Sequence, residues 1–79
     1  MNDRLLKEIE TIIRSVFQSE DIIVSLSTTA HDIPGWDSLK NIEILTTIEA
    51  KYSIRFSMAE LILLENIGDL VKNVEVKLK

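Results

Sequence analysis

Apolar side chains along this chain recur at helical spacing in separate stretches. Between residues 3 and 18 they lie three or four positions apart and form one stripe, while charged side chains fill the opposite face. A second stripe covers 38–51, a short helix follows Ser57, and a last helix begins at Asn66. The pattern predicts an all-α domain, a small four-helix bundle with three main helices, a short third helix and a long first loop.

The helix predicted over 38–51 has two kinds of apolar position. Most of them follow the spacing of three or four and are expected to face the core, namely Leu39, Ile42, Leu45, Ile48 and Tyr52. Ile44 falls outside this stripe, so we expect it to be accessible on the surface. The exposed face should otherwise carry polar side chains such as Lys40, Asn41 and Glu43.

The third helix is predicted from its cap, and its composition raises a question about burial. Ser57 is a good N-cap residue, and Glu60 three positions later completes a capping box. Four apolar residues follow in a row from Leu61 to Leu64, and four consecutive helical positions sweep about a full turn. At least one of them should therefore be exposed. Either a neighbouring loop covers part of the run, or the run forms an apolar contact patch.

A long connection, residues 19–37, joins the first two main helices. It is rich in Ser, Thr and Asp, which hydrogen-bond the local backbone and disfavour helix. Long loops in compact domains are usually functional or disordered. Here we expect the loop to be attached to the core by its apolar residues, which are Ile22, Ile23, Val24, Leu26 and Ile33. Trp36 is expected to anchor the end of the loop, and His31 to be a solvated loop residue.

The end of this loop, Asp37-Ser38, is where we place the candidate chemistry. Pro34-Gly35 precedes it and an apolar-periodic run follows, so a helix is expected to start beside Ser38 with Asp37 as its N-cap. The Ser38 hydroxyl would then lie among backbone N–H groups at the positive end of a helix dipole, where a phosphate is favoured. The simpler alternative is that the pair serves only as a cap.

Composition narrows the functions that such a bundle can have. The 79 residues make one domain, 1–79, and the net charge of −4 argues against a nucleic-acid partner, which needs a basic surface. The chain has no cysteine and one histidine, which excludes a cysteine-based or multi-histidine metal site. It shows no apolar run of membrane-spanning length and no secretion signal. We therefore expect a soluble monomer in the cytoplasm.

A known family shares the motifs of this chain in the same order. Asp-Ser-Leu at 37–39 and Gly-Asp-Leu-Val at 68–71 resemble the acyl carrier proteins and related thiolation domains, and the distance between the motifs also matches. Pro-Gly-Trp at 34–36 resembles the free-standing carriers more than the form found in fatty-acid synthesis. The resemblance covers essentially the whole chain. It implies that Ser38 carries 4′-phosphopantetheine through a phosphodiester.

The resemblance also implies roles for other residues. Asp37 and Leu39 would flank the attachment site, and Asp37 would help a transferase to hold its metal ion. The residues expected to dock partner enzymes are Lys40, Glu43, Ile44, Glu49, Leu61 and Ile62. The two acids among them, Glu43 and Glu49, could equally belong to a solvated helix face. The residues expected to form a cleft for an acyl chain are Ile42, Leu45 and Leu64.

The implied function is that of a carrier without catalytic activity of its own. The cofactor's thiol would hold acyl groups as thioesters, so the protein needs no cysteine. The partners would be a phosphopantetheinyl transferase and enzymes that load and transfer acyl groups in fatty-acid, polyketide or other secondary or polysaccharide metabolism. The alternatives are a peptidyl or D-alanyl-type carrier and a helical module that binds another protein. A serine hydrolase would need Ser38, His31 and Asp32 or Asp37 in one pocket, which so small a chain disfavours.

Overall fold

The computed structural model describes residues 3–78, and within that range it contains four α-helices and no strand. The helices are α1 (Asp3–Phe17), α2 (Ser38–Tyr52), α3 (Met58–Leu63) and α4 (Ile67–Lys77), and the first loop contains a 3₁₀ turn, η1 (Ala30–Asp32). The prediction of an all-α fold with a short third helix and a long first loop is confirmed. None of the helices in residues 3–78 is both long and apolar enough to cross a membrane.

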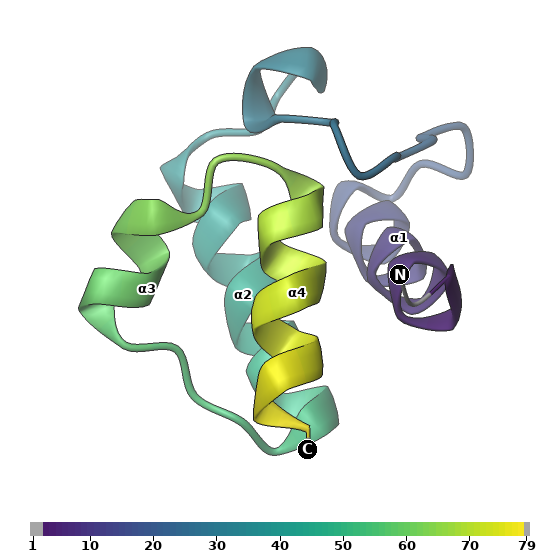
Figure 1. Cartoon of the computed structure of the whole chain (residues 1–79). Helices are drawn as coiled ribbons and strands as arrows, with labels where there is room; N and C mark the ends of the chain where they lie inside the picture. The colour runs from purple at the N-terminus through teal and green to yellow at the C-terminus, as the bar shows by residue number, and fades with distance from the viewer. Residues whose placement is uncertain (1–2, 79) are drawn as a thin grey trace.

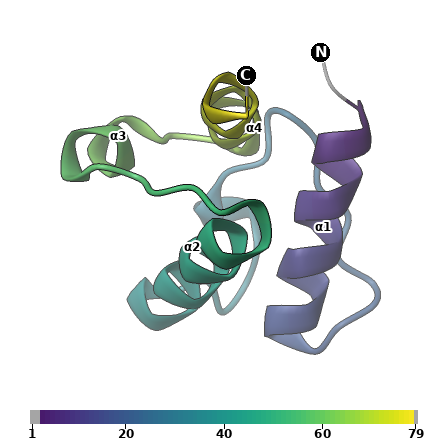
Figure 2. The same cartoon turned by 90° about the horizontal axis from the view of Figure 1, so that it is seen from below.

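The core lies where α1 meets α2 and α4. On α1 the buried side chains recur at helical spacing, namely Leu5, Ile9, Ile12 and Ile13. Burial of such a side chain contributes about 1.5–3 kcal/mol relative to leaving it in water. In both views of the ribbon α3 lies on the side away from α1 (Figures 1 and 2). The core is therefore built without α3, which buries no residue.

The first loop is fixed to α1 by two hydrogen bonds and two buried side chains. The guanidinium of Arg14 donates to the carbonyl of Ile22 at 2.6 Å, and the carboxylate of Glu10 accepts from the backbone N–H of Val24 at 2.9 Å. Val24 and Ile33 are buried, while Ile22 and Leu26 are half-buried. The expectation that Ile23 also pins the loop is wrong, because its side chain is 79% exposed.

The same loop also runs against the beginning of α4. The backbone N–H groups of Ile67 and Gly68 donate to the carbonyls of Thr28 and Leu26 at 2.8 Å and 2.7 Å. A Cβ on Gly68 would come within 2.8 Å of the Leu26 carbonyl oxygen, so this close approach requires glycine. Asn66 caps α4, since its side-chain oxygen accepts from the N–H of Asp69 at 2.8 Å. These contacts set the loop across the end of the bundle (Figure 1).

The inward face of α2 differs from the one that the sequence predicted. Ile44 and Ile48 are fully buried, whereas Leu39 is 63% and Ile42 57% exposed. The expectations that Ile44 lies on the surface and that Leu39 and Ile42 face inward are therefore wrong. A step of three residues falls about 60° short of a full turn, so the series of three-residue steps from Leu39 to Ile48 winds around the helix. The stripe that packs follows steps of four residues through Ile44 and Ile48.

The C-terminal end of α2 is joined to α1 by a hydrogen bond between side chains. The hydroxyl of Tyr52 donates to the carboxylate of Glu8. The same carboxylate also accepts a hydrogen bond from the guanidinium of Arg4 at 3.0 Å. The hydrogen bond from Tyr52 is the main reason why the pKa of Glu8 lies below its usual value. Burial, followed by the Glu8 carboxylate, raises the pKa of Tyr52.

Candidate functional site

The candidate site begins where the first loop turns into α2. Gly35 has a φ of +87°, a value that favours glycine, and the N–H of Trp36 donates to the Ile33 carbonyl at 3.3 Å. Asp37 is the N-cap of α2, because its side chain accepts from the backbone N–H of Lys40 at 2.9 Å. The predicted helix start at Ser38 and the predicted cap are both confirmed.

Ser38 is the first residue of α2 and is exposed. Among residues 3–78 its hydroxyl has no hydrogen-bond partner, since Asp37 serves the cap in its place. The first N–H groups of a helix lack partners within the helix and carry a partial positive charge, which favours a phosphate group. An exposed hydroxyl at this point fits a covalently attached phosphodiester without rearrangement of the cap.

Lys40 lies close to Ser38 but extends back over the end of α1. Its Nζ is 3.4 Å from the carbonyl oxygen of Val16, 3.8 Å from the Glu43 carboxylate and 5.8 Å from the centre of the Phe17 ring. A cation is favoured at the C-terminal end of a helix, where carbonyl groups lack partners. Lys40 therefore links α2 to α1, which the sequence did not suggest.

Trp36 fills the corner between the loop, α1 and α2. Its ring centroid is 5.9 Å from that of Phe17, and its indole N–H donates to the side-chain oxygen of Asn41 at 3.1 Å. The side chain is half-buried and packs on the core. These contacts agree with the predicted anchoring role for this residue, which also forms part of a pocket.

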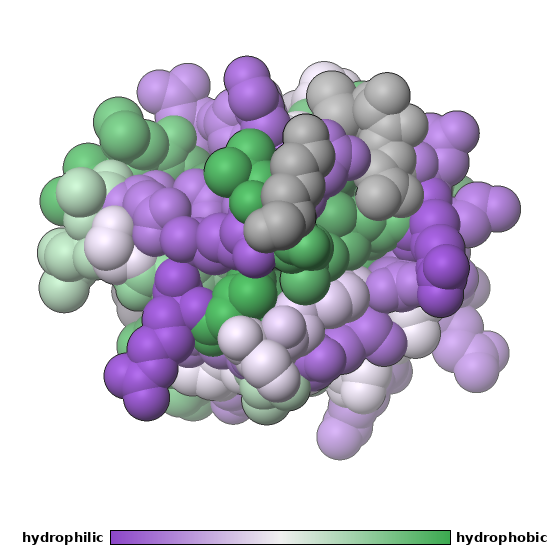
Figure 3. Space-filling model, turned by 60° about the horizontal axis from the view of Figure 1, so that its bottom comes forward, coloured by the Kyte–Doolittle hydropathy of each residue, from purple (hydrophilic) through white to green (hydrophobic). Residues whose placement is uncertain are grey.

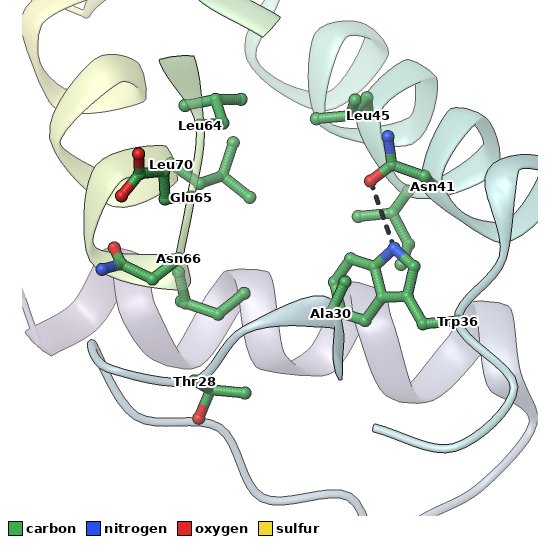
Figure 4. Close-up of a pocket in the computed structure, with 11 residues that line it drawn as sticks. Thr28, Ala30, Trp36, Asn41, Leu45, Leu64, Glu65, Asn66 and Leu70 are labelled. Atoms are coloured by element: carbon green, nitrogen blue, oxygen red, sulfur yellow. Dashed lines mark hydrogen bonds between the residues drawn. The ribbon is translucent and has the colours of Figure 1, made fainter. Parts of the chain in front are cut away.

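This pocket lies between α2, the loop and the connection from α3 to α4, and has a volume of about 70 Å³. Figure 4 shows Trp36 and Asn41 on one side and Leu64, Leu70 and Asn66 on the other, with Leu45 beyond Asn41. Ile44 and Ile67, both part of the core, also line it. The pocket is far smaller than the usual small-molecule site, which has about 300–1,000 Å³.

The structure brings together only some of the residues expected to form the acyl cleft. Leu45 and Leu64 line the pocket, but Ile42 is exposed and does not. The placement of Ile42 in the cleft is therefore wrong, for the same reason of helical register as its predicted burial. Sequence reasoning also missed Asn41, which it placed on the polar face. The available signal was its spacing of four residues before Leu45, which was expected in the cleft, since residues four apart are neighbours on a helix surface.

The expected docking residues divide into exposed and structural ones. Ile62 is 75% exposed and Leu61 half-buried, while Ile44 is fully buried and cannot meet a partner. The carboxylate of Glu49 accepts from the backbone N–H of Phe56 at 2.8 Å, which holds the loop after α2. Figure 3 shows hydrophobic atoms gathered on the side where α3 lies in Figure 1. The large apolar residues of α2 and α3 that are exposed are Leu39, Ile42, Met58, Ile62 and Leu63, which we call the α2–α3 apolar surface.

The opposite side of α3 is attached to α4 through Glu60. The predicted capping box with Ser57 is confirmed, and Lys77 donates to both Glu60 oxygens at 2.7 Å and 2.9 Å. Asn73 donates to the same carboxylate at 3.3 Å. We call Ser57, Glu60, Asn73 and Lys77 the Glu60 cluster. The hydrogen bond from Lys77, followed by that from the Ser57 N–H, lowers the pKa of Glu60 to about 2.

Comparisons with known proteins agree with the geometry at the start of α2. A family profile described as a phosphopantetheine attachment site matches residues 7–74. Among solved structures, the solution NMR structure of a holo acyl carrier protein from Geobacter metallireducens matches with a TM-score of 0.89 and 38% sequence identity. That match covers 94% of this chain and 85% of the other. A comparison with curated protein sequences finds no match.

Proposed function

The chain belongs to the phosphopantetheine-attachment family of acyl carriers, and on that premise we propose that Ser38 is the residue to which the cofactor is joined. The family assignment makes this chain a carrier with covalently attached 4′-phosphopantetheine and without catalytic activity of its own. The observation that supports Ser38 is its exposed hydroxyl, without a partner in residues 3–78, beside an Asp37 that already caps α2.

Different groups around Ser38 contribute to holding a phosphodiester. The Ser38 oxygen provides the covalent link, and the free N–H groups of the first turn of α2 face its negative charge. Asp37 keeps the helix start in place and leaves the Ser38 hydroxyl available to a transferase. When bound, the cofactor supplies the thiol that holds an acyl group as a thioester.

The partners in this proposal are a phosphopantetheinyl transferase and enzymes that load and remove acyl groups. The α2–α3 apolar surface adjoins the exposed acid Asp37 at the start of α2, which supports docking there. Lys40 contributes less positive charge to this surface than its sequence position suggests, because it extends back over α1. We place the carrier in fatty-acid, polyketide or related biosynthesis, with an aminoacyl cargo as the alternative.

The test of this proposal is the mass of the intact protein. We expect the wild type to gain the mass of one phosphopantetheine after incubation with coenzyme A and a broad-specificity transferase, and Ser38→Ala to gain nothing while it still folds. Ser15→Ala, which removes another exposed serine from the last turn of α1, is the matched control and should be modified fully. An unmodified wild type, or a modified Ser38→Ala protein, would contradict the proposal.

A further inference from the structure

The side chain of Asn41 is held in one orientation by Trp36. The indole N–H of Trp36 donates to the side-chain oxygen of Asn41 at 3.1 Å. Because an indole nitrogen can only donate, the atom of the amide that faces it has to be the oxygen. The indole is itself kept in place by Phe17, at 5.9 Å between ring centroids. The NH₂ group of Asn41 is therefore turned away from the indole (Figure 4).

This NH₂ group is an unused hydrogen-bond donor. Among residues 3–78 the side-chain nitrogen of Asn41 has no hydrogen-bond partner. Asn41 is exposed, and it lines the pocket on the same side as Trp36. The protein thus presents two donor hydrogens in an orientation that is already fixed. A group that accepts from them would not have to order the side chain first, which is a cost that most exposed side chains carry on binding.

Asn41 also lies where an arm attached to Ser38 has to pass. Residues three apart on a helix are neighbours on its surface, with about 5–6 Å between their Cβ atoms. Helical side chains lean towards the N-terminus of the helix, so that of Asn41 leans back over the turn that begins at Ser38. The other neighbour of Ser38 on this face is Ile42, which has no polar group. Asn41 is therefore the first side-chain donor beyond Ser38 on this face of α2.

We propose that Asn41 is a positioning residue for the phosphopantetheine arm, and that its NH₂ group donates to the carbonyl oxygen of the amide nearest the phosphate. The phosphodiester is already met by the N–H groups at the start of α2. The amide follows the phosphate after a short branched carbon unit, so its carbonyl is the next one along the arm. The arm then lies against α2 in place of moving freely in solvent. The inference rests on the proposed role of Ser38, because the arm is attached there.

The experiment observes Asn41 and the arm by NMR in the same molecule. Isotope-labelled protein is loaded by a transferase from coenzyme A whose pantetheine part carries a different label, and loading is checked by intact mass. We expect nuclear Overhauser effects between the NH₂ hydrogens of Asn41 and the methyl groups of the arm beside this amide. The NH₂ resonances of Asn41 should also shift between the apo and the loaded protein. The NH₂ group of Asn73, which donates to Glu60, is the internal reference and should not shift.

Asn41→Asp removes the donor but keeps an oxygen for the indole of Trp36. In this variant the methyl resonances of the arm should move to their positions in free coenzyme A, while the indole resonance stays near its wild-type position and shows that the protein is folded. Ile42→Asp is the matched control, because it adds the same charge one residue further along α2, at an exposed position outside the pocket. It should keep the contacts between Asn41 and the arm.

The outcomes separate this inference from the proposal on Ser38. If the intact mass never changes, the proposed function fails. If the arm is attached but shows no contact with Asn41, or contacts it only near the thiol, the inference on Asn41 alone is overturned. It is also overturned if Asn41→Asp keeps the arm resonances of the wild type, or if Ile42→Asp shifts them equally. If Asn41→Asp does not fold, the contacts in the wild type decide.

Discussion

The packed side of the molecule, where α1 meets α2 and α4, and the short helix α3 contain the same kinds of side chain but bury them differently. Ile9, Ile13 and Ile44 have no solvent exposure, whereas Ile62 and Leu63 on α3 are 75% and 73% exposed. The longest uninterrupted apolar run in the two regions is Leu61–Leu64, at the end of α3. Burial is therefore decided by spacing that matches the helical period and by neighbouring elements, and the number of apolar residues does not decide it.

The two regions also differ in what holds them. The first is held by apolar burial that extends over three helices and the loop, while α3 depends on the polar Glu60 cluster and on the half-buried Leu61 and Leu64. Segments with few buried apolar contacts open at lower free energy than the core does. This arrangement leaves apolar side chains of α3 exposed while the core remains intact.

The largest effect that tests this comparison is expected from an identical substitution in the two regions. Ile44→Ala should cost about 2–5 kcal/mol in the free energy of unfolding, because it leaves a cavity in the core. Ile62→Ala should stay within about 0.5 kcal/mol, since its side chain lies mostly in solvent. Urea denaturation of both variants measures the difference.

Ile42→Ala is the control for that experiment, because it lies on the same helix as Ile44 but is 57% exposed. It should behave like Ile62→Ala. If Ile42→Ala proved as costly as Ile44→Ala, the register of α2 would be the one that the sequence predicted, and the structure of this helix would be contradicted.

The sequence predicted the elements and their caps well because those signals are local. Asp37, Ser57 and Asn66 each form the cap that their residue type suggested, and the capping box of Glu60 is present. The motif at 37–39 and its spacing from Gly68 were enough to identify the family. These features depend on residues a few positions apart, which a sequence shows directly.

The sequence failed where the result depends on which neighbour a helix meets. Steps of three and of four residues both suit a helix, and the choice between Ile42 and Ile44 depends on where α1 packs on α2. The placement of Lys40 over Phe17 has the same origin, because the two residues are distant in sequence. The pocket was predicted only in part: Leu45 and Leu64 line it as the resemblance implied, but Trp36 and Asn41 were missed as lining residues, since the wall combines the loop, α2 and the connection before α4.

A moderate effect is expected where the loop crosses the start of α4. Gly68→Ala should destabilise the protein by about 1–3 kcal/mol, even though alanine favours helix, because its Cβ would lie 2.8 Å from the Leu26 carbonyl oxygen. Amide hydrogen exchange should quicken at Ile67 and Gly68, whose N–H groups donate to the loop. Lys72→Ala, at an exposed position of α4, should leave both the stability and the exchange at Ile67 and Gly68 unchanged. A Gly68→Ala protein as stable as the wild type would show that the loop can move away without loss.

The smallest effect concerns the attachment of α3 and depends on pH. Lys77, followed by the Ser57 N–H, lowers the pKa of Glu60 to about 2 from its usual 4.5, so the charged form is favoured in the folded state. A lowered pKa gives stability that is fully present above pH 4.5 and is lost as the pH falls from there towards 2. We therefore expect amide exchange in α3 to be slow at neutral pH, and its protection to fall selectively below pH 4.5 once exchange rates are corrected for the intrinsic effect of pH.

Glu60→Gln should reproduce at neutral pH the loss of protection that acid causes in α3, because the amide cannot form the ion pair with Lys77. The effect on global stability should be small, since α3 buries no residue. Glu75→Gln is the matched control on α4, where the carboxylate has no ion-pair partner among residues 3–78. Exchange in α3 should remain at the wild-type rate in that variant. If α3 were equally protected in the Glu60→Gln protein, the polar cluster would not hold it, and the half-buried Leu61 and Leu64 would be sufficient to attach the helix.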